Sequence, residues 1–135
     1  MKLSIDKQAS GLKIGLALQF ILGIYINLFV HFPENADAKA NWNFAQHSWI
    51  VLLHILIGTI LLINATVLLV RVYRLKLNLW KLPAIVGLIG IVIAWLSGEQ
   101  FVTTQQDGWS FAMALGFVLA VSIYGWGLAR NEAKK

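Results

Sequence analysis

The sequence predicts an all-α fold, an integral membrane protein built as an antiparallel four-helix bundle, in one domain over residues 1–135. Hydrophobic residues make up 59% of the chain and charged residues only 13%, whereas charged residues make up about 25% of a typical soluble protein. Four apolar runs reach the roughly 20 residues that a helix needs to cross a bilayer. Basic residues gather in alternate connections between these runs. A soluble protein of this composition would lack the polar side chains to cover its surface.

The four apolar runs place the membrane-spanning helices at residues 11–30, 48–70, 82–101 and 109–128. The first run is longer than the core of a signal peptide, so we expect it to be retained as a helix. Pro83 suits the first turn of the third helix, where its missing N–H costs no hydrogen bond. Asp107, Gly108 and Ser110 supply turn and N-cap chemistry before the fourth helix.

The distribution of charge predicts the orientation. Of the 11 lysines and arginines, only Lys39 lies outside the N-terminal segment, the connection between the second and third spans, and the C-terminal segment. By the positive-inside rule both termini are expected in the cytoplasm, with the loop 31–47 and the turn 103–107 outside. This pattern is typical of a multi-pass protein of the bacterial plasma membrane, with the lipid bilayer as its first partner.

Composition and charge argue against cysteine chemistry and against nucleic acid as a partner. The chain has no cysteine, so it has neither disulfides nor cysteine-based metal or redox sites. Its basic residues lie at the ends of apolar runs without interleaved aromatic residues, which argues against nucleic acid as a partner.

Aromatic and small residues indicate how the helices sit. Tryptophans are expected at the outer interface (Trp42, Trp49 and Trp109), at the inner interface (Trp80 and Trp126) and inside the bundle (Trp95). Small residues recur every four positions on the third and fourth spans: Gly90, Ala94 and Gly98, then Ala112, Gly116 and Ala120. Such ridges let membrane helices approach closely, either within one bundle or against a homodimer partner or another membrane subunit.

A histidine within the second span is the most unusual residue. His54 lies seven residues after His47, on the same helical face and about 10 Å deeper at 1.5 Å per residue. Ionisable residues inside a membrane are costly and indicate a functional site. Gly58 follows one turn later and removes side-chain bulk beside the imidazole. The imidazole is interpreted as bonded to a carbonyl, Ser97 or Glu99, as a haem ligand, or as a metal-binding or proton-handling group.

Further polar residues are expected in the same outer half, in a cluster made of Asn27, His47, His54, Ser97, Glu99 and Gln100. Met113 on the fourth span is interpreted either as a core gap-filler or as a metal ligand. Glu99 either reaches water at the membrane edge or faces the bundle and passes protons. The inner half offers fewer polar residues: Gln19, Asn64, Thr66 and Ser122.

The outer loop offers a second constellation of ligand-type side chains: His31, Glu34, Asp37 and His47. Two imidazoles and two carboxylates can bind zinc or copper. His31 and His47 of this loop, together with His54 of the second span, are candidate metal ligands. Their spacing matches no tight signature.

The segment that runs from His54 through Gly58 and a leucine-rich stretch to Arg71 and Arg74 resembles the second helix of the bacterial cytochrome b561 type. These four-helix membrane proteins hold haem b between helices and exchange electrons with quinone. The resemblance implies that His54 ligates haem b and that Arg71 flanks the helix on the cytoplasmic side. The fourth span has no histidine, which the family normally supplies, so the sixth ligand would be Met113, His47 or His31, or the iron would be five-coordinate.

Three functions follow as expectations. The first is a small membrane redox protein that binds one haem b or quinone near the outer face through His54, Gly58, Met113 or His47. The second is a non-enzymatic accessory subunit or sensor of a larger membrane complex. The third is a proton or ion relay that uses His54 and Glu99.

Overall fold

The computed structural model describes residues 2–33 and 36–133. This part of the chain forms five α-helices: α1 Lys2–Phe29, α2 Ala38–His47, α3 Trp49–Arg74, α4 Asn78–Thr104 and α5 Asp107–Glu132. α1, α3, α4 and α5 are long and apolar enough to cross a membrane, as the sequence predicts.

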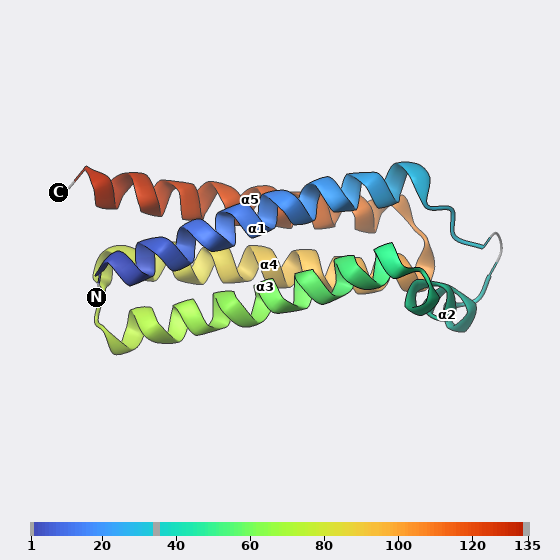
Figure 1. Ribbon diagram of the computed structural model, residues 1–135, viewed down its shortest axis with the longest axis horizontal. Coiled ribbons are helices and arrows are strands. Elements are labelled where there is room, and N and C mark those ends of the chain that lie inside the picture. The colour runs from blue at the N-terminus through green and yellow to red at the C-terminus, as the bar shows by residue number, and fades with distance from the viewer. Residues whose placement is uncertain (1, 34–35, 134–135) are drawn as a thin grey trace.

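The four long helices lie side by side along the long axis of the molecule (Figure 1). α1 and α4 each pack against both α3 and α5. The two chain ends lie at one end of the molecule and α2 lies at the other (Figure 1). We call these the terminal end and the α2 end, and the two parts of the bundle next to them the terminal half and the α2 half.

The helices extend beyond the apolar runs, and this corrects two expectations. α4 begins at Asn78, so Pro83 lies in its second turn and not in its first. Gly127 on α5 makes room for it, because a Cβ there would lie 3.0 Å from the Pro83 ring. α5 begins at Asp107 itself, behind Gln106 and without a side-chain cap. Apolar runs mark the part of a helix suited to lipid, whereas the helix itself continues into polar residues.

α2 is an element that the sequence analysis does not predict. It begins after Asp37, whose carboxylate accepts a hydrogen bond from the Ala40 amide at 2.8 Å, as an N-cap residue does. The helix packs against α3 and α4 at the α2 end. Trp42 ties it to α4 through a hydrogen bond from its indole N–H to the Thr103 hydroxyl, at 3.1 Å.

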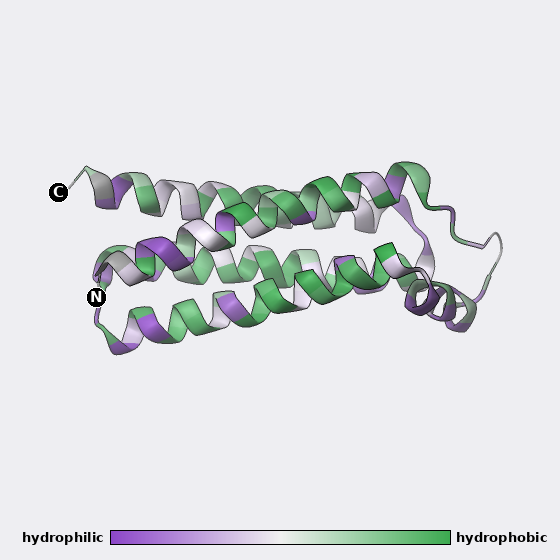
Figure 2. Ribbon diagram, in the orientation of Figure 1, coloured by the Kyte–Doolittle hydropathy of each residue, from purple (hydrophilic) through white to green (hydrophobic). Residues whose placement is uncertain are grey.

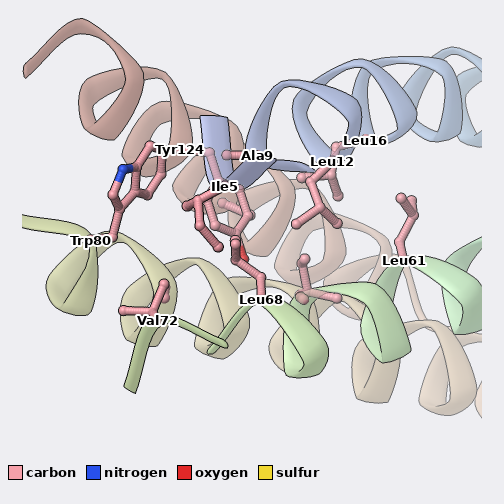
Figure 3. Packing of buried hydrophobic residues seen from close by; sticks show 13 residues of the cluster. Ile5, Ala9, Leu12, Leu16, Leu61, Leu68, Val72, Trp80 and Tyr124 are labelled. Atoms are coloured by element: carbon pink, nitrogen blue, oxygen red, sulfur yellow. The ribbon is translucent and has the colours of Figure 1, made fainter. Parts of the chain in front are cut away.

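The terminal half holds the larger buried core, drawn in Figure 3, to which all four long helices contribute: Ile5, Ala9, Leu12, Leu16, Leu61, Ala65, Leu68, Val72, Trp80, Ala84, Ile91, Ala120 and Tyr124. Trp80 is 1% exposed, so it packs in this core and not at an interface with lipid. Trp95 shows the reverse, because 38% of its surface is exposed.

α4 and α5 approach most closely where their small residues meet. A Cβ on Gly90 would lie 2.7 Å from the Gly116 carbonyl oxygen, and one on Gly116 would lie 2.5 Å from the Gly90 carbonyl oxygen. The small-residue ridges therefore pack against each other within the bundle, which confirms the first of their two interpretations.

Large apolar side chains cover the outside of the bundle, among them Ile14, Leu18, Ile21, Leu56, Ile60 and Phe111. Figure 2 shows hydrophobic residues along the lengths of the long helices and hydrophilic residues gathered at the two ends and in α2. Such a surface suits lipid contact on all sides.

Candidate functional site

A cavity of about 560 Å³ lies inside the α2 half of the bundle. Side chains from all four long helices line it, together with Trp42 of α2 and Phe32 of the connection before it. Sites for small molecules and cofactors measure about 300–1,000 Å³ and have apolar walls with a few polar groups. This cavity matches that description in size and in lining.

The cavity brings together four of the residues that the sequence predicts to share a depth. Asn27 of α1, His54 of α3, Glu99 of α4 and Met113 of α5 all line it. The Met113 sulfur lies beside Gly98, 3.8 Å from where a Cβ of that residue would be.

Three members of the expected outer cluster lie outside this lining. Ser97 is buried elsewhere, at 5% exposure, and Gln100 is not a wall residue of the cavity. His47 ends α2, where its Nδ1 lies 2.8 Å from the Asn43 carbonyl oxygen of the same helix. Depth along a helix axis correctly predicts that Asn27, His54, Glu99 and Met113 line one cavity. The direction of each side chain decides which other residues at that depth join them.

The His54 imidazole packs against α1. A Cβ on Gly23 would lie 3.1 Å from the imidazole Cε1, so the ring uses the space that this glycine leaves. Its Nδ1 is buried and has no hydrogen-bond partner in the described chain. Within the described residues, Nδ1 therefore does not make the expected bond to a carbonyl, Ser97 or Glu99. An unpaired buried nitrogen is rare in folded proteins and calls for an explanation, such as a catalytic role or an absent ligand.

Gln19 is a residue of the site that the sequence analysis assigns to the other half. Its Nε2 donates to the His54 carbonyl oxygen at 2.7 Å. A Cβ on Gly58 would lie 3.0 Å from this nitrogen, so Gly58 makes room for Gln19. Gly58 also lines the cavity together with His54. Because the carbonyl only accepts, the amide orientation is fixed, and the Gln19 Oε1 is a second buried atom without a partner in the described residues.

A sequence signal for this pairing does exist. Gln19 is followed by Gly23 at a spacing of four residues, and His54 by Gly58 at the same spacing. Each glycine receives the polar side chain of the facing helix. The same spacing on two successive spans is the pattern that would have indicated Gln19 and Gly23.

Aromatic residues close the sides of the cavity. Phe20 of α1 and Phe117 of α5 stack with ring centroids 4.4 Å apart. Trp95 of α4 donates to the Thr59 hydroxyl of α3 at 3.2 Å. Other wall residues are also exposed on the outside of the bundle, at 44% for Ile24 and 61% for Leu28.

The expected metal ligands do not gather into one site. No three histidine, aspartate, glutamate or cysteine side chains in residues 2–33 and 36–133 lie close enough to hold an ion. Asp37 caps α2, and His47 and His54 lie in different surroundings. Glu34 lies outside the described residues.

Comparison with known proteins gives no relative: no family model, curated protein or solved structure matches this chain. The resemblance of its second span to the cytochrome b561 type therefore stays a prediction. The function has to be inferred from the cavity and its side chains.

Proposed function

We propose that this chain is a small redox protein of the bacterial plasma membrane that holds one haem b in the α2-half cavity and transfers electrons. In this proposal the bundle is antiparallel, both termini are cytoplasmic and α2 lies outside, as the charge distribution favours. The observation that carries the proposal is the buried His54 imidazole, which has an unpartnered nitrogen and borders a cavity of about 560 Å³.

The residues present fit a haem. A neutral histidine is a common axial ligand, and histidine with methionine is an established pair that raises the reduction potential. His54 would hold the iron from α3, and Met113 of α5, which lines the same cavity, would be available as a second ligand. One-electron transfer is the chemistry that a haem b supplies in such a site.

The protein's own contribution is to orient His54 and to exclude water. Gln19 bonds the carbonyl of His54 and so ties the turn of α3 that carries the imidazole to α1. Phe32 and Trp42 cover the cavity at the α2 end. A dry, largely apolar surrounding is one of the means by which a protein tunes a haem.

A quinone is the second candidate, and a specific observation favours it. The Gln19 Oε1 and the His54 Nδ1 are both buried without partners in the described chain, on two residues that a hydrogen bond links directly. The hydroxyl groups of a reduced quinone could donate to these two atoms. Removal of either acceptor would then weaken binding.

The test is an absorption spectrum of the detergent-purified protein, oxidised and then reduced with dithionite, from cells supplied with haem. We expect a Soret band with sharp α and β bands on reduction, and we expect His54→Ala to abolish them. His47→Ala is the matched control, because His47 lies outside the cavity, and it should leave the spectrum unchanged. Ala114→Leu should lower haem content by narrowing the cavity that Ala114 lines.

A flat visible spectrum at full haem supply would exclude the haem. Bound quinone in an organic extract of the same sample, lost in Gln19→Leu, would then establish the second candidate. If both cofactors are absent, stoichiometric co-purification of another membrane protein would indicate an accessory subunit. Proton flux in liposomes that Glu99→Gln removes would indicate a relay.

A further inference from the structure

An open groove runs along the outside of the bundle between α1 and α3, in the terminal half. Its lining residues are Gln8, Ile60, Ile63, Asn64 and Val67, and none of them borders the α2-half cavity. On α3 these residues recur at intervals of three or four positions, which places them on one face of the helix. The groove therefore follows the axis of α3.

One end of this groove lies at the edge of the hydrocarbon core. Gln8 precedes the apolar run 11–30, and Arg71 follows the apolar run 48–70. At this level hydrocarbon gives way to lipid headgroups. Ile60 lies on the same face of α3 as Arg71, about 16 Å further along the axis at 1.5 Å per residue. This length is close to one leaflet, which is half of a hydrocarbon core about 30 Å thick.

Arg71 brings a positive charge to this end of the groove. It donates through Nη1 to the Gln8 Oε1 and through Nη2 to the Ser4 hydroxyl, the latter at 2.7 Å. Both of these acceptors are neutral, so they do not balance the charge. A guanidinium has five N–H donors, and three of them remain for a further acceptor.

Two more basic residues lie at the same level. Lys7 of α1 and Arg74 of α3 are both exposed, and Arg74 follows Arg71 in the last turn of its helix. One carboxylate lies in the same turn of α1 as Lys7, that of Asp6, and it accepts from Asn131 of α5 at 2.7 and 2.8 Å. Three positive charges against one negative charge leave this end of the groove positive.

A neutral donor lies deeper in the groove. Because the Gln8 Oε1 accepts from Arg71, its Nε2 is directed to Asn64, where it donates to the backbone oxygen at 3.2 Å and to Oδ1 at 2.8 Å. The Asn64 Oδ1 is thus an acceptor, and its Nδ2 is left as a donor on an exposed residue.

We infer that this groove, the α1–α3 groove, binds a phospholipid with an anionic headgroup. The parts of such a lipid match the groove in order. Its phosphate is negative and only accepts hydrogen bonds, as the three basic side chains require. Its ester carbonyls also only accept, which suits the Asn64 amide below them. One acyl chain then lies over the apolar wall of Ile60, Ile63 and Val67.

Charge complementarity selects this occupant. A zwitterionic lipid would bring an ammonium group of its own beside three basic side chains, whereas an anionic headgroup brings only negative charge. An apolar helix of another protein would cover Arg71 and Asn64 without offering acceptors to either, which is costly in hydrocarbon.

Native mass spectrometry of the detergent-purified chain, titrated with one lipid at a time, gives the dissociation constant of the first lipid bound. Each basic side chain near a headgroup strengthens the binding of anionic lipid about 5-fold. We therefore expect phosphatidylglycerol to bind at least about 5-fold more tightly than phosphatidylcholine. Equal constants for the two lipids would overturn the inference.

Removal of single charges locates the headgroup. Arg71→Gln and Arg74→Gln should each weaken phosphatidylglycerol binding about 5-fold. The exposed Arg74 provides an independent test if loss of the Arg71 hydrogen bonds unfolds the chain. Arg130→Gln is the matched control, because Arg130 is exposed at the same end but lies over the Trp126 ring of α5. An equal effect at all three positions, or none at the two α3 positions, would overturn the inference.

Added bulk locates the acyl chain. Packing against protein is what favours the groove over the surrounding detergent, so we expect Val67→Trp to weaken phosphatidylglycerol binding at least about 3-fold. Val118→Trp is the control, because Val118 is similarly exposed, at 53% against 46%, but lies on α5. Equal constants for these two variants would overturn the inference. No cofactor enters any of these measurements, so their outcome is separate from that of the haem spectrum.

Discussion

The two halves of the bundle are built from the same four helices, yet one is filled and the other is hollow. In the terminal half, side chains such as Leu68 and Tyr124 are 0% exposed and pack in one core (Figure 3). In the α2 half, the same helices surround a cavity of about 560 Å³. The α2 half has a smaller buried cluster of its own, made of Ile26, Ala45, Val51 and Val102. The difference teaches that one bundle can concentrate its packing in one half and leave room for a ligand in the other.

Glycines have different roles in the two halves. Where α4 meets α5, Gly90 and Gly116 let the two backbones touch. Around the cavity, Gly23 and Gly58 instead receive the polar side chains of a facing helix. The same residue type therefore removes space in one half and shapes the surroundings of a binding site in the other.

Truncation of one apolar side chain in each half should show the largest difference in stability between the two halves. Leu68→Ala leaves a void in a packed core, and we expect it to lower the free energy of unfolding by about 2 kcal/mol or more. Ile24→Ala removes a side chain that borders an existing cavity and is 44% exposed, so a loss below about 1 kcal/mol is expected. Denaturant titration in detergent micelles, followed by circular dichroism, measures both. Equal losses would mean that the two halves do not differ in packing.

Glycine-to-alanine changes should give the next largest contrast. The Cβ of Gly116→Ala would lie 2.5 Å from the Gly90 carbonyl oxygen, and overpacking of this kind costs about 1–3 kcal/mol. The Cβ of Gly98→Ala meets only the Met113 side chain, with the sulfur at an ordinary 3.8 Å, so its effect should stay within about 0.5 kcal/mol. Thermal unfolding in the same detergent compares them. A Gly116→Ala protein as stable as wild type would show that α4 and α5 can separate at little cost.

The smallest effect should have the opposite sign. The Tyr124 hydroxyl is buried and has no hydrogen-bond partner in the described residues. Tyr124→Phe removes a polar group whose hydration is lost without replacement, so we expect the free energy of unfolding to rise by up to about 1 kcal/mol. The titration used for Leu68→Ala measures it. A decrease larger than about 1 kcal/mol would mean that the hydroxyl bonds a group such as an ordered water.

Much of this architecture could be predicted from sequence, because apolar length and helical rise are strong signals. They locate the four long helices, and they place Asn27, His54, Glu99 and Met113 at one depth. What they miss depends on three dimensions. The sequence places Gln19 in the inner half, away from His54, but its side chain reaches the His54 carbonyl oxygen.

Other omissions have the same kind of cause. α2 has a mixed polar and apolar sequence with no long apolar run, so a search for spans passes over it. The pairing of Arg71 with Gln8 joins residues 63 positions apart, and no local pattern links them. Tryptophan near the end of a span is typical of an interfacial anchor, and only the neighbours of Trp80 in the fold make it a core residue.

The exposed wall of the cavity affects how occupancy should be quantified. Phe32 and Trp42 cover the α2 end, whereas Ile24 and Leu28 belong both to the cavity wall and to the outer surface of the bundle. With the bundle in a bilayer, a hydrophobic molecule would partition into the acyl chains first and reach the site sideways from there. Its effective concentration is then a mole fraction of the lipid. Titrations of this protein should accordingly vary the lipid-to-ligand ratio and not the volume of buffer.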